Sequence, residues 1–430
     1  MQRKDLKVTI VCSVSGELSS LKILLYEHVS SGGLSGNSIP ASLLSEGYGM
    51  LRGIASDFKS AGHEVSILLD SRVASLSSHF QTDEVISVGS YDDVNTIINK
   101  LAEIVDAAFV IAPEHGHILQ SIVERIEATN IFSLNCESRT IEQVSNKVDL
   151  LKRASKLGLE SPKTLTFFFN ESIDKVKQSI KHNMSFPVVI KPMDGTSCSG
   201  LSIARNENQV AEAIGKAKSE SFCSSGIAQE YVQGVNASVS LICTGIDAFQ
   251  MSLNLQELEL LDPVTDSSYV GGQVPFEHPL KAEAFNAAKR LLMSYEGLRG
   301  YVGVDFVLTE NKAFVMEVNP RLTTSYIGLR RTINFNLAQA ITDSVLKQKN
   351  PGNIKNRGVA VFRKIPVRKS DISHWQDICD RQYLVSPPFP LNKDCLSCAL
   401  IEAYGSNLNQ ATVHLNQAKD QVDQCLTSGE

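Results

Sequence analysis

The stretch YVGVDFVLTENKAFVMEVNPR, residues 301–321, consists of two apolar runs joined by a short polar segment at 310–312. Apolar runs of this length around such a segment predict a β-hairpin. If the hairpin is symmetric about Asn311, Asp305 lies directly opposite Glu317 on the neighbouring strand. The stretch therefore predicts that two carboxylates face each other at the end of the hairpin away from its turn.

The two faces of this hairpin differ in character, because side chains alternate between faces along a strand. One face carries Asp305, Glu317 and Asn319, with Gly303 leaving space beside them. Facing carboxylates repel, and a cation that prefers oxygen ligands, Mg²⁺ or Mn²⁺, removes this cost. The pattern predicts a metal site, and a solvated polar face on an ordinary hairpin is the alternative. The opposite face is wholly apolar: Val304, Phe306, Leu308, Phe314, Met316 and Val318.

Other segments offer groups that could bind a nucleotide. Lys191 ends the apolar run PVVIK, where an ammonium must either reach solvent or meet an anion. The loop that follows, PMDGTSCSG at 192–200, is rich in small residues and offers backbone N–H and hydroxyl donors to a triphosphate, as a plain hairpin loop also would. Lys147 lies in a predicted amphipathic helix, where a solvated face is the default interpretation. Arg321 supplies a fork of donors for a phosphate or a developing oxyanion.

The N-terminal part alternates short apolar runs with longer amphipathic ones. This alternation predicts a mostly parallel sheet covered by helices on both faces. Ligands in such sheets bind beyond the carboxyl ends of the strands, where Glu27 and Glu114 stand. The expected strands are 22–27, 64–70, 84–88 and 107–113, and the expected helices are 41–61, 92–105 and 118–129.

The rest of the chain predicts a mixture of strands and helices. Helices are expected over 140–157, 172–182, 207–218, 281–295 and 326–347. Strands are expected over 163–169, 187–192, 201–205, 227–232, 238–245 and 253–261, besides the hairpin. The strand end at 229–232 could offer an amide and a carbonyl to an adenine edge. The segment NPGNIKN at 350–356 resembles a linker into a smaller C-terminal unit.

Composition narrows the class of protein. A chain of 430 residues with 43% hydrophobic residues is expected to fold as about two to four domains or lobes. The net charge of −6 and the lack of a basic stripe argue against nucleic-acid binding. Nine scattered cysteines favour a reducing cytoplasm, and Cys395-x-x-Cys398 lacks the second pair that a zinc site needs. No apolar run reaches the roughly 18 residues of a membrane span.

Taken in the order in which they occur along the chain, the motifs resemble those of the ATP-grasp superfamily from about residue 21 to 347. The matching text is NK..LLK...KLGLESPKT, FPVVIKPMDGTSCSG, AQEYV.G...SVSL, GYVGVDFVL and FVMEVNPR. The resemblance implies an α/β chain with α+β grasp lobes. It divides the chain into an extension (1–20), a Rossmann-like pre-ATP-grasp domain (21–136), a small central lobe (137–232), a C-terminal lobe with the metal site (233–349) and a C-terminal subdomain (350–430).

The resemblance also implies roles for individual residues. Lys147 and Lys191 correspond to the two nucleotide-binding lysines, and Arg321 to the arginine that steadies an acyl phosphate, with Lys191 assisting catalysis. Asn236 stands where many relatives have a ribose-binding glutamate, which puts the ribose contact in doubt. The implied magnesium ligands are Asp305, Glu317 and Asn319. The implied phosphate loop includes Gly195, Thr196, Ser197, Ser199 and Gly200. The implied adenine contacts are Gln229, Glu230, Tyr231 and Val232.

Within the superfamily, the text LKILLYEHVSSGG, LLSEGYGML, VIAPEHGHIL and NPRLTTSYIGL is most similar to the archaeal tyramine–glutamate ligases of methanofuran biosynthesis. This implies small-molecule partners, a carboxylate and an amine, with Glu27, Glu114, Thr323 and Thr324 as substrate contacts. A homodimer is left open. The alternatives are another ATP-grasp ligase, peptide-forming or carboxylase-like, a dinucleotide-binding oxidoreductase using SSGGLSG, and a non-catalytic nucleotide sensor. The second lacks G-x-G-x-x-G spacing, and the intact acidic set argues against the third.

Overall fold

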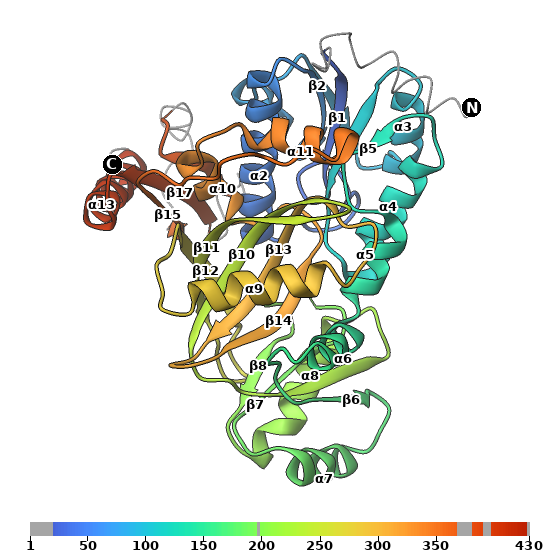
Figure 1. Cartoon of the computed structure of the whole chain (residues 1–430), viewed down its shortest axis with the longest axis vertical. Coiled ribbons are helices and arrows are strands. Elements are labelled where there is room, and N and C mark those ends of the chain that lie inside the picture. The colour runs from blue at the N-terminus through green and yellow to red at the C-terminus, as the bar shows by residue number, and fades with distance from the viewer. Residues whose placement is uncertain (1–19, 196–197, 368–380, 390–396, 428–430) are drawn as a thin grey trace.

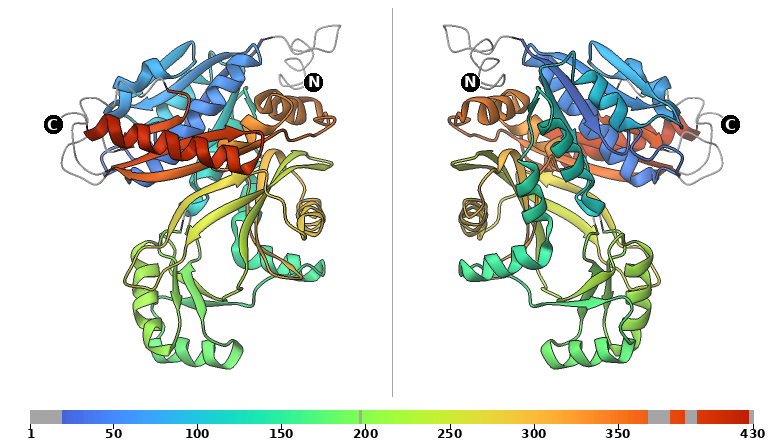
Figure 2. Two further views of the ribbon diagram at one scale, coloured as in Figure 1. Left: turned by 90° about the vertical axis from the view of Figure 1, so that its left-hand side faces the viewer. Right: turned by 90° about the vertical axis from the view of Figure 1, so that its right-hand side faces the viewer.

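The computed structural model describes residues 20–195, 198–367, 381–389 and 397–427. The extension expected over 1–20 lies outside these ranges except for its last residue. The described strands form three sheets, of five, eight and four strands. In Figure 1 the five-stranded sheet lies at the top, the eight-stranded sheet in the middle and the four-stranded sheet at the bottom; the side views in Figure 2 show the small lobe standing below the rest.

The five-stranded sheet confirms the predicted parallel N-terminal domain. Its order is β3-β2-β1-β4-β5, and every neighbouring pair is parallel. The apolar runs form the central strands because both faces are covered: all five residues of β4 are buried. Since β1 and β4 are neighbours, Glu27 and Glu114 come to the same edge. The elements are β1 (Lys22–Glu27), α2 (Ala41–Ser60), β2 (Glu64–Asp70), η1 (Ser71–His79), β3 (Glu84–Val88), α3 (Val94–Leu101), β4 (Ala107–Ile111), η2 (His115–His117), α4 (Ile118–Glu127) and β5 (Phe132–Ser133).

The small lobe is an antiparallel sheet of order β6-β9-β7-β8 with its own apolar core beneath two helices. The prediction of one long helix over 140–157 was wrong. The chain forms two helices because Asn146 takes extended backbone angles, and its side chain accepts a hydrogen bond from the Asp149 backbone N–H. The break makes Lys147 the first residue of the second helix. The elements are α5 (Ser138–Ser145), α6 (Lys147–Lys156), β6 (Thr164–Phe168), α7 (Ile173–Asn183), β7 (Val188–Pro192), β8 (Ser202–Ala204), η3 (Glu207–Gln209), α8 (Val210–Ser219) and β9 (Ser225–Glu230).

The eight-stranded sheet is antiparallel, in the order β14-β13-β10-β11-β12-β15-β17-β16. Its last three strands come from beyond residue 350, so the segment expected as a separate C-terminal subdomain continues the sheet of the preceding lobe. The helix expected over 326–347 is two helices, because Asn336 caps a new start by accepting from the Gln339 N–H. The elements are β10 (Val235–Thr244), β11 (Ala248–Glu259), β12 (Ser268–Val274), α9 (Lys281–Leu292), β13 (Arg299–Leu308), β14 (Ala313–Asn319), α10 (Tyr326–Thr332), α11 (Leu337–Lys347), β15 (Val359–Val367), β16 (Leu384–Phe389), β17 (Ser397–Gly405) and α13 (Leu408–Thr427).

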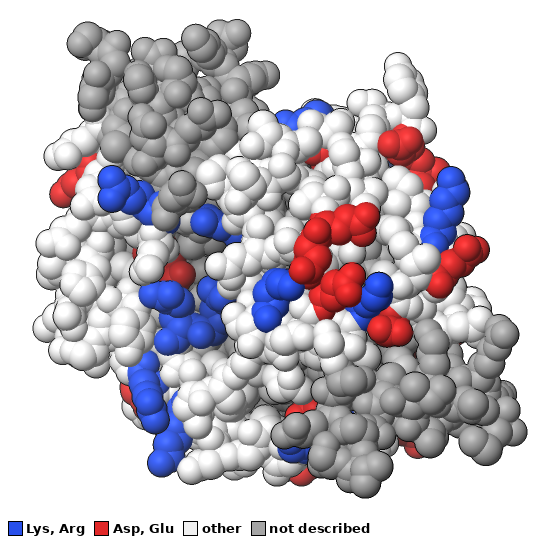
Figure 3. Space-filling model, turned by 90° about the horizontal axis from the view of Figure 1, so that it is seen from above, with Lys and Arg blue, Asp and Glu red and all other residues white. Residues whose placement is uncertain are grey.

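The surface carries charges of both signs. Seen from above, several Lys and Arg side chains lie together in one part of the face, and in another part Asp and Glu side chains lie among Lys and Arg (Figure 3). Among the described helices, none is both long enough and apolar enough to cross a bilayer.

Helix α2 joins the N-terminal domain to the large sheet, because it packs against β1 and β2 on one side and against β16, β17 and α10 on the other. A polar cluster fixes this junction. Asp57 of α2 accepts from Arg330 of α10 at 2.6 and 3.1 Å, and also from the Tyr326 hydroxyl. The Asn336 side chain donates to the Asp57 carbonyl oxygen at 2.8 Å.

Replacing Asp57 should therefore destabilise the protein. In Asp57→Ala the largely buried Arg330 and Tyr326 lose their acceptor, and we expect the free energy of unfolding to fall by about 3 kcal/mol. Urea denaturation followed by circular dichroism measures this change. The control is Lys152→Ala, which breaks an exposed ion pair with Asp149 and should leave stability nearly unchanged. Equal effects of the two substitutions would show that the Asp57 cluster does not hold the junction.

Candidate active site

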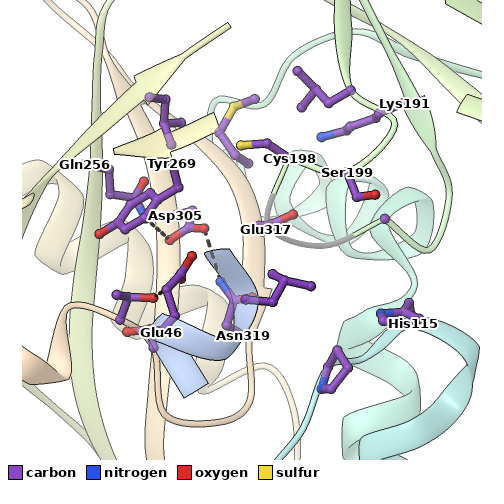
Figure 4. A pocket seen from close by; sticks show the side chains of 18 of the residues that line it. Glu46, His115, Lys191, Cys198, Ser199, Gln256, Tyr269, Asp305, Glu317 and Asn319 are labelled. Carbon is purple, nitrogen blue, oxygen red and sulfur yellow. Dashed lines mark hydrogen bonds between the residues drawn. The ribbon is translucent and has the colours of Figure 1, made fainter. Parts of the chain in front are cut away.

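A cavity of about 460 Å³ lies where the N-terminal domain, the small lobe and the large sheet meet. The N-terminal domain contributes residues from α2 and from the carboxyl ends of β1 and β4. The small lobe contributes residues from β7, β9 and the loop after β7, and the large sheet contributes residues from β11 to β14. Figure 4 shows side chains from all three parts directed into this space.

The hairpin β13–β14 pairs as predicted at its polar end. Asp305 lies opposite Glu317, and Gly303 opposite Asn319. Asp305 is held from two sides, since Gln256 donates to Oδ1 at 3.0 Å and Asn319 to Oδ2 at 3.1 Å (Figure 4). The carboxylates and the amide oxygen therefore line the cavity together.

Near its turn the hairpin departs from the symmetric register. Phe306 lies opposite Val315, so Met316 is an extra residue on its strand, a β-bulge. The bulge reverses the faces of the residues before it: Val315 is buried in the core, whereas Met316 lines the cavity. The expectation that Met316 and Phe314 belong to the apolar core face was wrong for this reason.

The charges around the hairpin fit a divalent cation. Burial and the neighbouring Glu317 raise the pKa of Asp305. Burial opposes ionisation of Glu317 as well, but the charges of Lys147 and Lys191 lower its pKa overall, and Lys147 Nζ lies 2.8 Å from Glu317 Oε2. A bound cation would relieve the repulsion between the two carboxylates. Within the described ranges, no group of three His, Cys, Asp or Glu side chains could hold a metal. The two carboxylates and Asn319 thus supply only part of a coordination shell, as is usual where phosphate oxygens complete it.

Lys191 lies at the inner end of β7 and points into the cavity (Figure 4). Its side chain is buried, and among the described residues none forms a hydrogen bond or ion pair with it. Burial, and then the charge of Lys147, lowers the pKa of Lys191 to about 8. A buried ammonium without a partner is costly, so this position fits a bound anion such as a phosphate.

The loop after β7 lines the cavity beside the Lys191 ammonium. Gly195, Cys198 and Ser199 line the cavity, and Thr196 and Ser197 lie outside the described residues. Gly200 does not line it; its backbone has a φ of +68°, and a side chain there would collide with Pro192 at 2.8 Å. Cys198 was not predicted from the sequence.

The loop is fastened to a second loop of the small lobe. Asp194 accepts from the Ser221 hydroxyl at 2.7 Å and from the Phe222 N–H at 3.1 Å, and Ser199 donates to Glu220 at 2.7 Å. Phe222 in turn stacks on His115 of the N-terminal domain, with ring centroids 5.3 Å apart. Through these contacts the loop after β7 is connected to the wall of the cavity that the N-terminal domain forms.

One end of the cavity is lined by the residues that the sequence predicts to contact adenine and ribose. Gln229, Glu230, Tyr231, Val232 and Asn236 all line it. The Gln229 amide nitrogen donates to Thr164 at 3.0 Å, whereas its buried Oε1 has no hydrogen-bond partner among the described residues. Glu230 accepts instead from the backbone N–H of Lys163 at 3.3 Å. Apolar side chains from both lobes lie on this cavity's walls, and they are Val189, Leu258, Leu260 and Met316.

Arg321 and Glu114 form an ion pair across the domain boundary. Arg321 Nε lies 2.9 Å from Glu114 Oε1, and Nη2 donates to Oε2 at 3.1 Å. Arg321 lines the cavity, while Glu114 stands behind it. The nearby Thr323 hydroxyl lies 3.1 Å from the Tyr301 hydroxyl. The ion pair with Glu114 holds the guanidinium at the cavity wall, which Asp305, Glu317 and Asn319 also line.

Glu27 lines the cavity, but its carboxylate is engaged by its own loop. It accepts from the Val29 N–H at 3.2 Å and from the N–H and hydroxyl of Ser30, both at 2.7 Å. Burial raises the pKa of Glu27. The structure therefore gives this residue a role in shaping the loop after β1, besides its place at the cavity wall.

Sequence reasoning missed a second acidic group, Glu46. Its Oε1 lies 2.7 Å from Lys364 Nζ of β15, and its Oε2 accepts from the Thr324 hydroxyl at 2.7 Å. Tyr269 of β12 also lines the cavity, and the Lys364 ammonium lies 5.5 Å from the centre of its ring. The sequence signal for Glu46 was its place in LLSEGYGML, which was quoted for the resemblance without a role for this residue, and nothing in the sequence around Lys364 indicated a site.

Comparison with known proteins agrees with this geometry. A family model described as ATP-grasp domain matches residues 144–325, and a model described as pre ATP-grasp 3 domain matches residues 63–141. Tyramine–L-glutamate ligase of Methanocaldococcus jannaschii is 28% identical over 313 residues, which are 72% of this chain and 84% of the relative. The enzyme of the same name from Methanocaldococcus fervens is 29% identical over 310 residues, 72% of this chain and 89% of the relative.

Among solved structures, the L-amino acid ligase from Bacillus licheniformis superposes with a TM-score of 0.67. The match covers 94% of this chain and 98% of that one at 13% identity, and shows a shared fold. Together, the two matched domains, the ligase relatives and the arrangement of lysines and acidic residues in one cavity show that the chain is an ATP-grasp ligase, an enzyme that forms carbon–nitrogen bonds with ATP.

Proposed function

We propose that this ligase joins L-glutamate to a primary aromatic amine such as tyramine, giving the γ-glutamyl amide, ADP and phosphate. The names of the two relatives support the choice of substrates. The observation that carries the proposal is the convergence of the Asp305–Glu317 pair, two lysines and Arg321 on one cavity. In the relatives' pathway this product would serve methanofuran biosynthesis, and we place the reaction in the cytoplasm.

The residues of the cavity divide the work between them. Asp305, Glu317 and Asn319 would hold Mg²⁺ or Mn²⁺, which neutralises charge on the phosphate oxygens. Lys147 and Lys191 stand where they can bind the same phosphates, and the unpartnered Gln229 Oε1 can accept from the amino group of adenine. This set of groups positions the nucleotide and stabilises transferred charge, which is how phosphoryl-transfer enzymes achieve most of their rate.

The reaction proceeds in two displacements. A γ-carboxylate oxygen of glutamate attacks the γ-phosphorus of ATP, the bond to the ADP oxygen breaks, and glutamyl phosphate forms. The neutral amine then attacks the acyl carbon, the C–O bond to phosphate breaks, and the amine nitrogen loses a proton to the departing phosphate or to water. Arg321 can bind the negative oxygens of the acyl phosphate and of the tetrahedral intermediate. The loops joined through Asp194 and Phe222 cover the cavity and exclude water, which would hydrolyse the intermediate.

The proposal is tested by measuring ADP release with panels of carboxylates and amines. Glutamate together with tyramine should release ADP and yield a product with the mass of glutamyltyramine. ADP release with a different pair would keep the ligase and replace the substrates. A wild-type protein that releases no ADP with glutamate and any aromatic amine would contradict the substrate assignment.

Removing either facing carboxylate should abolish turnover without unfolding the protein. We expect Asp305→Asn and Glu317→Gln each to lower kcat by at least about a hundredfold, because charge on the phosphates is no longer neutralised. Steady-state kinetics at saturating Mg-ATP measure the effect, and circular dichroism checks the fold. The matched control is Glu310→Gln, an exposed residue in the turn of the same hairpin, which should keep wild-type activity. Near-normal activity in either site variant would eliminate the metal site.

Lys191→Ala should raise the KM for ATP by about tenfold to a hundredfold, because one charge-assisted contact with phosphate is lost. The low pKa of Lys191, about 8, adds a pH dependence. In the nucleotide-free enzyme the side chain is charged below this pH and neutral above it, so ATP affinity should fall as the pH rises through 8. Titration of ATP binding at several pH values measures this fall, which should be absent from Lys191→Ala. An identical pH profile in both proteins would show that Lys191 does not meet the phosphates.

A further inference from the structure

Helix α2 presents one face to the cavity beyond the metal site. The cavity-lining residues of α2 are Leu43, Glu46, Gly47 and Met50, which recur at intervals of three and four and so lie on a single face. Gly47 keeps this face open where β1 approaches, since a side chain there would meet the Glu27 carboxylate at 2.4 Å. The face therefore consists of one carboxylate between two apolar side chains.

The carboxylate of this face is rigidly placed. Glu46 is buried, its two oxygens are held by Lys364 and Thr324, each at 2.7 Å, and Lys364 also donates to Ser42 at 2.7 Å. Glu46 and Thr324 line the cavity, whereas Lys364 does not. In Figure 4 Glu46 lies on the same side of the cavity as Asp305 and Asn319. The lysine thus holds the carboxylate from behind and leaves its front toward the reaction centre.

Apolar side chains share the cavity wall with Glu46, beside the polar Thr324 and Tyr269. Leu34, from the loop after β1, lines the cavity together with Leu43, and both are only partly covered by other residues. Met50 is buried beside them on the same helix face. Partly exposed leucines in a concave site are typical of a surface that receives an apolar ligand group.

Resting on the proposed function, we propose that this α2 face is the amine subsite and that Glu46 is its specificity-determining residue. A primary arylalkylamine matches the face, because it can bind as the ammonium paired with Glu46 while its ring packs against Leu34, Leu43 and Met50. The bound ammonium then loses one proton, to Glu46 or to water, before the neutral nitrogen attacks. Glutamate matches it poorly, because its two carboxylates would be repelled by Glu46 and would lose water against apolar side chains. The cationic groups Lys191 and Arg321 offer the better environment for those carboxylates.

Hydroxylamine separates the amine subsite from the rest of the site, because this small neutral nucleophile traps glutamyl phosphate as the hydroxamate and carries neither ring nor ammonium. In Glu46→Gln the KM for tyramine should rise about tenfold to a hundredfold, since a charge-assisted contact is lost. Hydroxamate formation and the KM values for ATP and glutamate should stay unchanged. In Leu43→Ala the preference for tyramine over methylamine should fall about fivefold, because apolar contact with the ring is lost.

The matched control is Glu257→Gln, which removes a carboxylate from the ion pair with Arg363 on adjacent strands, outside the cavity. Its tyramine kinetics should equal those of the wild type. Equal losses of amide and hydroxamate formation in Glu46→Gln, an unchanged KM for tyramine, or a raised KM for glutamate would each overturn the proposal.

Calorimetric binding of tyramine to the wild type and to Glu46→Gln gives a readout that needs no turnover, and equal affinities would also overturn it. Failure of the proposed function has a different signature: the wild type makes neither hydroxamate nor amide from glutamate.

Discussion

The site depends on one electrostatic constraint, the placing of two carboxylates opposite each other on neighbouring strands. Asp305 and Glu317 repel, and burial makes the repulsion costlier. Lys147, at the start of α6, forms an ion pair with Glu317 and offsets part of this repulsion. The carboxylate charge that Lys147 does not offset faces the cavity. Under the proposed function, a bound cation and nucleotide would complete the balance. The arrangement of the three parts of the molecule follows from the need to bring these charges to one place.

Each part of the molecule supplies a different chemical function to that place. The large sheet holds the acidic end of the hairpin, the small lobe brings Lys191 and the loop after β7, and the N-terminal domain brings Glu46 and the Glu114 partner of Arg321. The ion pairs across these boundaries are short and largely buried, so they fix the relative positions of the parts. The stack of Phe222 on His115 is the corresponding contact between the small lobe and the N-terminal domain.

Local patterns in the sequence were sufficient to predict the register of the acidic hairpin and the parallel N-terminal sheet. The register at Asp305 and Glu317 follows from two apolar runs around a short turn, and the parallel N-terminal sheet follows from alternating strands and helices. The bulge at Met316 could not be predicted in this way, because alternating apolar residues fit a regular strand equally well. The breaks at Asn146 and Asn336 depend on side-chain caps, which a run of amphipathic residues does not reveal.

The contacts between segments that lie far apart in the chain could not be predicted from the sequence. Glu46 and Lys364 are separated by 318 positions, and they meet only because β15 to β17 extend the large sheet past α2. Glu46 lies in the quoted stretch LLSEGYGML, but nothing there assigned it a partner, and Lys364 lies in none of the quoted motifs. The fold alone brings these two residues together, whereas Lys147, Lys191 and Arg321 were predicted from the sequence and the structure places all three at one cavity.

The central claim is that this cavity activates a carboxylate by phosphorylation before an amine attacks it. Transfer of ¹⁸O from glutamate to phosphate tests that claim most directly. Glutamate labelled in its carboxylates is supplied with ATP and tyramine, and the released phosphate is analysed by mass spectrometry. Our account predicts that the phosphate carries one labelled oxygen for each amide formed, whereas unlabelled phosphate alongside a glutamyl amide would contradict it.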